Sequence, residues 1–539
     1  MSQPPEKNDP AQAEWLAAVL VTAAIFCLHV HFWLHAGGLW RDEVSLVNLA
    51  GSPSLAAMTQ DSFPILMPLF VKFWSAVGGS DLWLRLLGMI FGLAIPAAFW
   101  AVARTTRRPP LFSLVLFGLN ALLVCYGDSL RGYGLGTALL VFALAAMWSF
   151  LKNPTWPRAG ILALAATLSV QALYQNSVLF FAICLGAFAV CWRRKNISAA
   201  LKIFCAGLAA AISLLPYYAN IVGLPQAAIS LRRGLSAFIL SLNFEMATGF
   251  PFEQFVVVWK ILAAVVVGFA VLSLCRAGSK GRTEGAILPL FAGATLVSVA
   301  VLFVGFSWFA AVAARPWYFL PPLALAAVCF DFGISLPELP RLVRAAVFGF
   351  LLGTALVAVP AAYSDLRGHL TNVDRLAARV GAGASPQDFV VVTPWFCGIS
   401  FHRYFPADIP WTTLPPLADH SAHRYDLVRA QMQDTNSLAP VLEKISATLR
   451  AGHRVWVVEE QMNIPPANAP APPVLPPPPL PDYGWSDTPY TASWASRTGF
   501  FLAQHAVRFG DLPGADDGAV CFHEHLYLLV AEGWKNSDE

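Results

Sequence analysis

Long apolar runs fill the first two thirds of the chain and are separated by short polar connections. A membrane-crossing helix needs about 20 mostly apolar residues, and the pattern predicts eleven such spans. They lie near 16–36, 83–103, 109–126, 133–151, 159–175, 177–192, 199–221, 254–275, 286–309, 316–333 and 345–363. The sequence therefore predicts a polytopic α-helical membrane protein whose transmembrane module covers residues 1–363.

The pattern changes after residue 363, where short strand-like runs alternate with amphipathic stretches. The strand-like runs are 388–393, 454–459 and 520–530, and the helical stretches lie near 365–382, 421–450 and 492–509. This order predicts a C-terminal α/β domain over residues 364–539. The proline-rich segment 464–481 predicts an extended spacer or surface loop, because proline cannot donate a hydrogen bond to a strand ladder.

Composition supports the membrane assignment and narrows the partners. Hydrophobic residues make up 57% of the chain and charged residues 12%, whereas soluble domains carry about 25% charged residues. A formal net charge of +3 gives no reason to expect a nucleic-acid partner. The nine cysteines show no metal-type or redox-type spacing. Cys397 and Cys521 both fall in the C-terminal domain, where a disulfide is chemically permitted.

Basic residues occupy every second connection between the predicted spans. They are Arg104, Arg107 and Arg108; Lys152 and Arg158; Arg193, Arg194 and Lys195; Arg276, Lys280 and Arg282; Arg341 and Arg344. Positive loops stay cytoplasmic, so this alternation predicts a cytoplasmic N-terminus. With eleven spans, the domain at 364–539 would then lie outside the cytoplasmic (inner) membrane, in the periplasm or the extracellular space.

The sharpest candidate for chemistry directly follows the first span, at Trp40-Arg41-Asp42-Glu43. An arginine stands there against the positive-inside pattern, beside two adjacent carboxylates. Ionisable groups at a membrane boundary often belong to functional sites, and a carboxylate can act as a general base. The alternative is a solvated loop start with an internal ion pair.

Two later turns on the same predicted side add to this cluster. The first contains Asp128, Arg131 and Tyr133, and its structural alternative is a helix start with Asp128 at the N-cap. The second contains Arg315 and Tyr318, and its alternative is an interfacial aromatic belt with a snorkelling arginine. Together the turns predict a site that binds an anionic headgroup beside an acid/base carboxylate.

The order of these motifs resembles the GT-C superfamily of membrane glycosyltransferases. The likeness is nearest to the branch of aminoarabinose transferases and protein O-mannosyltransferases. It rests on these segments: Asp42-Glu43; Phe63-Pro64-Ile65-Leu66; Leu84-Arg85-Leu86; Asp128 with Arg131-Gly-Tyr133-Gly-Leu135; and Arg315 to Pro321. The chain departs from the family at Phe63, where a histidine is usual, and Asp128 precedes its arginine by three residues instead of two.

The resemblance implies inverting transfer of a hexose or pentose from a polyprenyl-phosphate-linked donor to a glycan, lipid or protein acceptor. Asp42, Glu43 and Asp128 would be catalytic. Substrate would be bound by Arg41, Arg131, Tyr133, Arg315 and Tyr318. A divalent metal is compatible with this scheme, with Glu43 as a ligand or an orienting group.

Two functions of other classes compete with this one. A transporter or flippase of a lipid-linked or anionic substrate would predict charges near mid-span and inverted repeats, whereas the charges here gather at span ends. A receptor or assembly scaffold would leave Asp42 dispensable.

Overall fold

The computed structural model describes residues 10–59, 63–219, 233–275, 284–309, 314–334, 336–406, 408–461, 464–466, 469–512 and 521–535. The chain divides into two compact units. The first comprises Met1–Leu34, Thr59–Val222 and Arg233–Leu366, and the second comprises His35–Met58, Gly223–Arg232 and Arg367–Glu539. The segment His35–Met58, which carries the acidic motif, therefore groups with the C-terminal α/β domain and not with the membrane helices around it in sequence.

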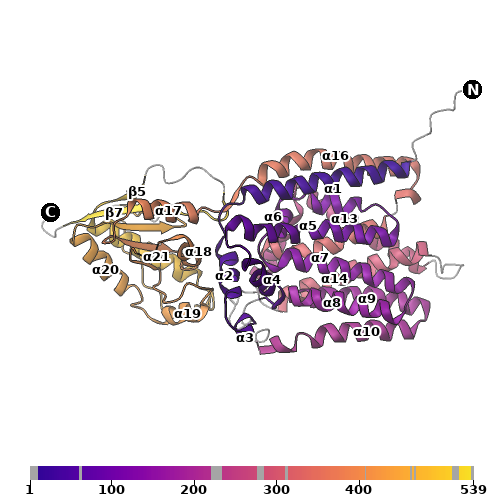
Figure 1. Ribbon diagram of the computed structural model, residues 1–539, viewed down its shortest axis with the longest axis horizontal. Coiled ribbons are helices and arrows are strands. Elements are labelled where there is room, and N and C mark those ends of the chain that lie inside the picture. Colours follow the sequence, from indigo (N-terminus) through magenta and orange to yellow (C-terminus); the bar gives the residue numbers. More distant parts are fainter. Residues whose placement is uncertain are drawn as a thin grey trace, which may run out of the picture. The chain divides into compact units, whose positions relative to one another are not determined.

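The first unit is a bundle of long helices (Figure 1). Its main helices are α1 (Pro10–His35), α4 (Leu66–Ser75), α5 (Asp81–Thr106), α6 (Ala121–Gly127), α7 (Gly132–Lys152), α8 (Trp156–Ala172), α9 (Asn176–Arg194), α10 (Ile197–Ile212), α12 (Arg233–Thr248), α13 (Phe255–Cys275), α14 (Glu284–Phe309), α15 (Leu320–Gly333) and α16 (Arg341–Asp365). Eight helices within the described residues are long and apolar enough to cross a membrane. The polytopic helical architecture is confirmed.

Three predicted spans differ from full-length helices. Helix α8 has 17 residues and α15 has 14. The span predicted at 109–126 is broken into a π-helix, Ser113–Gly118, and the short helix α6. The break has a local cause, because the Asn120 side chain accepts hydrogen bonds from the amides of Leu122 and Leu123 and so starts a new helix.

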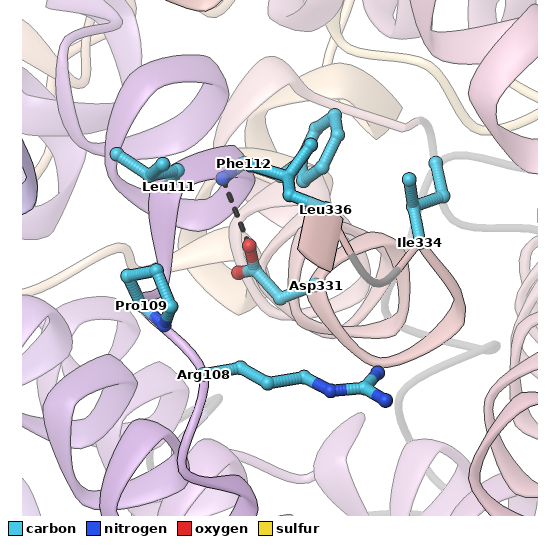
Figure 2. A pocket seen from close by; sticks show the side chains of 7 residues that line it. All are labelled: Arg108, Pro109, Leu111, Phe112, Asp331, Ile334 and Leu336. Carbon is cyan, nitrogen blue, oxygen red and sulfur yellow. Dashed lines mark hydrogen bonds between the residues drawn. The ribbon is translucent and has the colours of Figure 1, made fainter. Parts of the chain in front are cut away.

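A buried carboxylate anchors the other end of this broken helix (Figure 2). Asp331 of α15 accepts hydrogen bonds from the Phe112 amide at 2.9 Å and the Ser113 amide at 3.1 Å. The Ser113 hydroxyl also donates to this carboxylate. Since the first amides of a helix have no intrahelical acceptors, Asp331 serves as a helix cap from a distant part of the chain.

The second unit contains a five-stranded sheet of order β3-β2-β4-β7-β5. Strands β3 (Trp411–Thr413), β2 (Phe389–Thr393) and β4 (Val455–Glu459) are parallel, and β7 (Tyr527–Trp534) and β5 (Ala506–Asp511) continue the sheet antiparallel. A separate parallel pair joins β1 (His369–Thr371) to β6 (Cys521–Glu524). The predicted α/β organisation is confirmed, but the run at 520–530 forms two strands. The helix predicted to 509 ends at His505.

Helices cover both faces of this sheet, as expected for strands that read as continuous valine runs. Helices α17 (Val373–Gly383) and α18 (Cys397–Tyr404) pack on one face. Helices α19 (Tyr425–Gln433), α20 (Ala439–Arg450) and α21 (Thr488–His505) pack on the other. Every residue of β2 and β4 is buried, so the sheet forms the central layer of the unit.

The proline-rich segment is attached to this domain where the structure describes it. The Tyr490 hydroxyl donates to the Pro476 carbonyl at 2.8 Å, and Leu475 and Leu480 pack on the core beside α21. Residues 469–478 form no helix or strand, in keeping with the predicted extended segment, and their packing on the core is a contact that the sequence did not indicate. The Cys521 side chain and the basic loop 276–283 lie outside the described residues, so the disulfide and that loop's charges stay predictions.

Candidate active site

The acidic motif forms the start of helix α2 (Arg41–Ala50), which packs against α18 within the second unit. Two hydrogen bonds tie the preceding segment to the domain. The Leu39 amide donates to the Tyr404 hydroxyl at 2.6 Å, and the Leu370 amide donates to the Ala36 carbonyl at 2.9 Å. Asp42 and Glu43 both lie in the first turn, where negative charge is favoured by the helix dipole.

Glu43 caps the amino end of helix α2. Its side chain is fully buried, and its Oε2 accepts a hydrogen bond from the Trp40 amide at 3.4 Å. This is the return contact of a capping box. The contact favours a capping role for Glu43 over the predicted catalytic one.

Asp42 is placed differently, with its side chain 19% exposed. Its Oδ1 lies 3.4 Å from the Nε2 of His423 and 4.0 Å from the Nε of Arg41. A carboxylate beside two nitrogen-bearing side chains is stabilised in its ionised form when they are charged. Partial exposure leaves it within reach of a substrate hydroxyl.

Arg41 is fixed by a buried carboxylate on strand β6. Its guanidinium Nη1 lies 3.4 Å from the Oε1 of Glu524, and its backbone amide donates to the same oxygen at 3.1 Å. The guanidinium also lies over the ring of Phe396, 4.3 Å from its centre. Burial raises the pKa of Glu524, although the charge of Arg41 opposes this shift. Burial alone would lower the pKa of Arg41, but Glu524 raises it above the ordinary arginine value.

These side chains gather at the carboxyl ends of the parallel strands. Trp395 and Phe396 follow β2, His423 lies in the connection after β3, and Glu459 ends β4. Open α/β sheets commonly bind ligands at this edge. Sequence reasoning missed His423 and Glu524 as partners of the acidic motif. The only available signal was an acidic residue in a strand-like run, at position 524.

The first unit contains the second predicted cluster, and the structural alternative considered for Asp128 is not the one observed. Asp128 is not the N-cap of a helix; it ends α6, and its amide donates to the Val124 carbonyl. Arg131 occupies the N-cap position of α7 instead. The Asp128 Oδ1 lies 2.6 Å from the Nδ1 of His29, and both side chains are buried. Asp128 Oδ2 is also buried and has no hydrogen-bond partner among the described residues.

Two glycines of α5 allow the turn at Asp128 to pack closely against that helix. A methyl group on Gly92 would overlap the Asp128 Oδ1, and one on Gly88 would overlap the Asp128 carbonyl. The two glycines are four residues apart on α5, the spacing that lets backbones approach closely in membrane proteins. The Asp128–His29 pair therefore depends on the bare surface of α5.

Aromatic rings surround Arg131 in the same unit. Its guanidinium lies 4.2 Å from the ring centre of Phe63, and Phe63 packs edge-on against Tyr133 at 5.4 Å. The ring of Tyr133 lies 6.2 Å from that of Tyr318. Three residues of the predicted site, Arg131, Tyr133 and Tyr318, therefore lie close together in the structure. Arg315 has an exposed side chain, and its carbonyl accepts the Tyr318 amide at 3.0 Å.

Among the described residues, no group of three or more His, Cys, Asp or Glu side chains is arranged to hold a metal ion. Glu43 caps its own helix while Asp42 faces His423.

No family model matches the chain, and no curated protein matches it in sequence. Among solved structures, the oligosaccharyltransferase of Archaeoglobus fulgidus in complex with Zn and sulfate is 11% identical to this chain, with a TM-score of 0.46. The match covers 93% of this chain and 73% of the oligosaccharyltransferase chain. ArnT from Cupriavidus metallidurans bound to undecaprenyl phosphate is 12% identical, with a TM-score of 0.46, covering 84% and 93%. ArnT from Cupriavidus metallidurans in the apo state is 11% identical, with a TM-score of 0.47; the match covers 84% of this chain and 94% of that of ArnT.

Proposed function

We propose that this chain is an integral membrane glycosyltransferase. It moves a sugar from a polyprenyl-phosphate-linked donor to a glycan, lipid or protein acceptor at the outer face of the cytoplasmic membrane. The observation that carries the proposal is Asp42, a partly exposed carboxylate fixed at a helix start beside Arg41 and His423. The described part of the chain that carries Asp42 includes eight candidate membrane spans.

In this mechanism Asp42 accepts the proton of the attacking hydroxyl. The hydroxyl oxygen forms a bond to the anomeric carbon while the bond from that carbon to the phosphate oxygen breaks. The lipid phosphate leaves with the electron pair, and attack from the opposite side inverts the configuration. Asp42 serves as the base and not as a nucleophile in this scheme.

Arg131 is proposed to bind the donor phosphate, because a planar guanidinium can donate two parallel hydrogen bonds to phosphate oxygens. The neighbouring Phe63, Tyr133 and Tyr318 rings offer apolar faces for the sugar or the first prenyl units. Arg315 is proposed as a second, more exposed phosphate contact. Asp128 is hydrogen-bonded to His29. We therefore propose that Asp128 stabilises the turn in which Arg131 lies.

The proposed location follows from the alternation of basic loops. A reporter fused after Glu539 should be active only outside the cytoplasm. Activity of the reporter in the cytoplasm would contradict this orientation.

The test of the function is sugar transfer from a synthetic polyprenyl-phosphate sugar in membranes that contain the full-length protein. Asp42→Asn should lower the transfer rate by about 10²–10⁴, the usual contribution of a general base. Asp511→Asn is a matched control, because Asp511 is exposed at the end of edge strand β5. Transfer at the wild-type rate by Asp42→Asn would refute the role of this carboxylate.

Transport of a lipid-linked substrate is the second candidate. The observation that favours it is the buried His29–Asp128 pair, because intramembrane pairs of this kind also occur in proton relays of transporters. A transporter would return its substrate chemically unchanged, and the same assay distinguishes this outcome.

A further inference from the structure

We propose that His423 is a positioning residue for Asp42 and receives the proton that Asp42 takes from the acceptor hydroxyl. This inference rests on the proposed function of Asp42 as the general base. It assigns to the C-terminal domain a direct part in the chemistry, at a residue that lies outside every motif of the family resemblance.

The two side chains come from segments almost four hundred residues apart in sequence but belong to one unit. The Nε2 of His423 lies 3.4 Å from the Asp42 Oδ1, and the two side chains are 21% and 19% exposed. Distances between catalytic groups are often long without substrate and shorten in the complex. A contact of 3.4 Å is therefore close enough for a proton to pass once the substrate is bound.

The packing around His423 fixes the orientation of its ring. The ring lies edge-on to Trp395 at 6.1 Å and stacks on Tyr425 at 5.9 Å. Trp395 is itself held, because its Nε1 donates to the Oδ2 of Asp487 at 2.9 Å. These rings flank the imidazole while its Nε2 lies 3.4 Å from the Asp42 Oδ1.

The charged neighbours leave the imidazole as the suitable proton acceptor. Arg41, the other nitrogen-bearing neighbour of Asp42, is paired with Glu524 and cannot take up a proton, because a guanidinium is already protonated and has no lone pair. Arg424, which follows His423 in sequence, forms ion pairs with Asp419 and Asp426. Other ionisable groups near Arg41 are Cys397 and Glu460. Of the two nitrogen-bearing neighbours of Asp42 described here, only a neutral His423 can accept a proton.

The proposed step balances without any further reactant. The acceptor O–H bond breaks as its oxygen bonds to the anomeric carbon, and the proton goes to Asp42. It then passes to the Nε2 of His423, which restores the carboxylate. The imidazolium releases the proton to water, since its ring is partly exposed. The electron pair of the broken glycosyl bond leaves with the lipid phosphate, and nothing is oxidised or reduced.

The test compares His423→Gln and His423→Ala with His453→Gln and His453→Ala in the full-length protein. His453 is a suitable control because it precedes β4, at the amino end of the parallel strands and thus opposite the edge where His423 lies. We expect His423→Gln to lower kcat by roughly 10–100-fold, less than loss of the base itself, with the KM for the donor unchanged. The acid limb of the pH profile, which a neutral imidazole ordinarily sets between about pH 5 and 8, should disappear.

Added imidazole should restore transfer in His423→Ala and should have no effect in the His453 variants. Wild-type kcat and an unchanged pH profile in His423→Gln would overturn the inference. A loss that imidazole does not restore would also overturn it and indicate a structural role. Asp42→Asn, measured in parallel, separates the two proposals. Its activity would contradict the function of Asp42, whereas an inactive Asp42→Asn with a fully active His423→Gln would contradict only this inference.

Discussion

At the scale of single residues, the three arginines of the predicted site have different surroundings. Arg41 is paired with Glu524, Arg131 is buried over Phe63, and Arg315 is exposed. A cation over an aromatic face gains about 0.5–2 kcal/mol, depending on how far it is desolvated. Arg131 is therefore the best-ordered candidate for the donor phosphate in the first unit.

Arg131→Lys should weaken binding of polyprenyl phosphate by about tenfold or more, which corresponds to roughly 1.4 kcal/mol. The reason is that an ammonium is a compact point charge and cannot grip two phosphate oxygens as a guanidinium does. Calorimetric titration of the purified protein measures this affinity, with Arg508→Lys on the exposed part of β5 as control. Arg315→Lys should have a smaller effect, and unchanged affinity in both variants would favour simple snorkelling.

The residues that the sequence revealed are those that break a rule of membrane proteins. Asp42 was identifiable because it stands beside an arginine on the wrong side of the charge pattern. His423, the partner of Asp42, and Glu524, the partner of Arg41, were not identifiable, since they follow hundreds of residues later and their contacts depend on tertiary packing. Phe63 stands where the family usually has a histidine, and in the structure its ring packs against the guanidinium of Arg131.

At the scale of elements, close packing of α5 against the Gly127–Asp128 turn determines the geometry of the second cluster. Gly92→Ala should destabilise the protein by about 1–3 kcal/mol, as overpacking usually does, because the added methyl group meets the Asp128 carboxylate. Thermal unfolding of the detergent-solubilised protein measures the effect.

Gly160→Ala on α8 is the matched control. Nothing lies within 4 Å of its added methyl group, and alanine is favoured over glycine within a helix by about 0.5–1 kcal/mol. This variant should be neutral or slightly more stable. Equal unfolding temperatures for Gly92→Ala and the wild-type protein would contradict the packing account.

Helices and strands with long sequence patterns could be predicted, whereas short elements could not. Apolar runs of 20 residues identify long helices regardless of context, and the valine runs of β2 and β4 identify buried strands. Edge strand β5 and the three-residue β3 were missed, because short strands owe their conformation to neighbours. The break near Asn120 was missed because a single capping side chain interrupts a run that remains apolar.

At the scale of the whole molecule, the acidic motif belongs to the same compact unit as the C-terminal domain. A domain that lies outside the membrane, as the charge pattern predicts for residues 364–539, is expected to cover the acceptor side, so that its loss weakens acceptor use more than donor hydrolysis. The structure changes this expectation. Deleting residues 367–539 removes Glu524, His423 and Tyr404, the partners that hold Arg41, Asp42 and Leu39.

The truncated protein should therefore lose both sugar transfer and hydrolysis of the donor, although its membrane helices still insert. Donor consumption and membrane insertion can be measured on the same preparation. Donor hydrolysis at the full-length rate by a correctly inserted truncation would show that the acidic motif works without the domain.

The most direct test of the central claim is mass spectrometry of the lipid products formed in proteoliposomes from a defined polyprenyl-phosphate sugar, in the presence of membrane-derived acceptors. If the protein transfers sugar with Asp42 as the base, free polyprenyl phosphate is released in equal amount to the sugar transferred, and both products are lost in Asp42→Asn. Intact donor that only changes leaflet, equally in the wild-type protein and in Asp42→Asn, would contradict it.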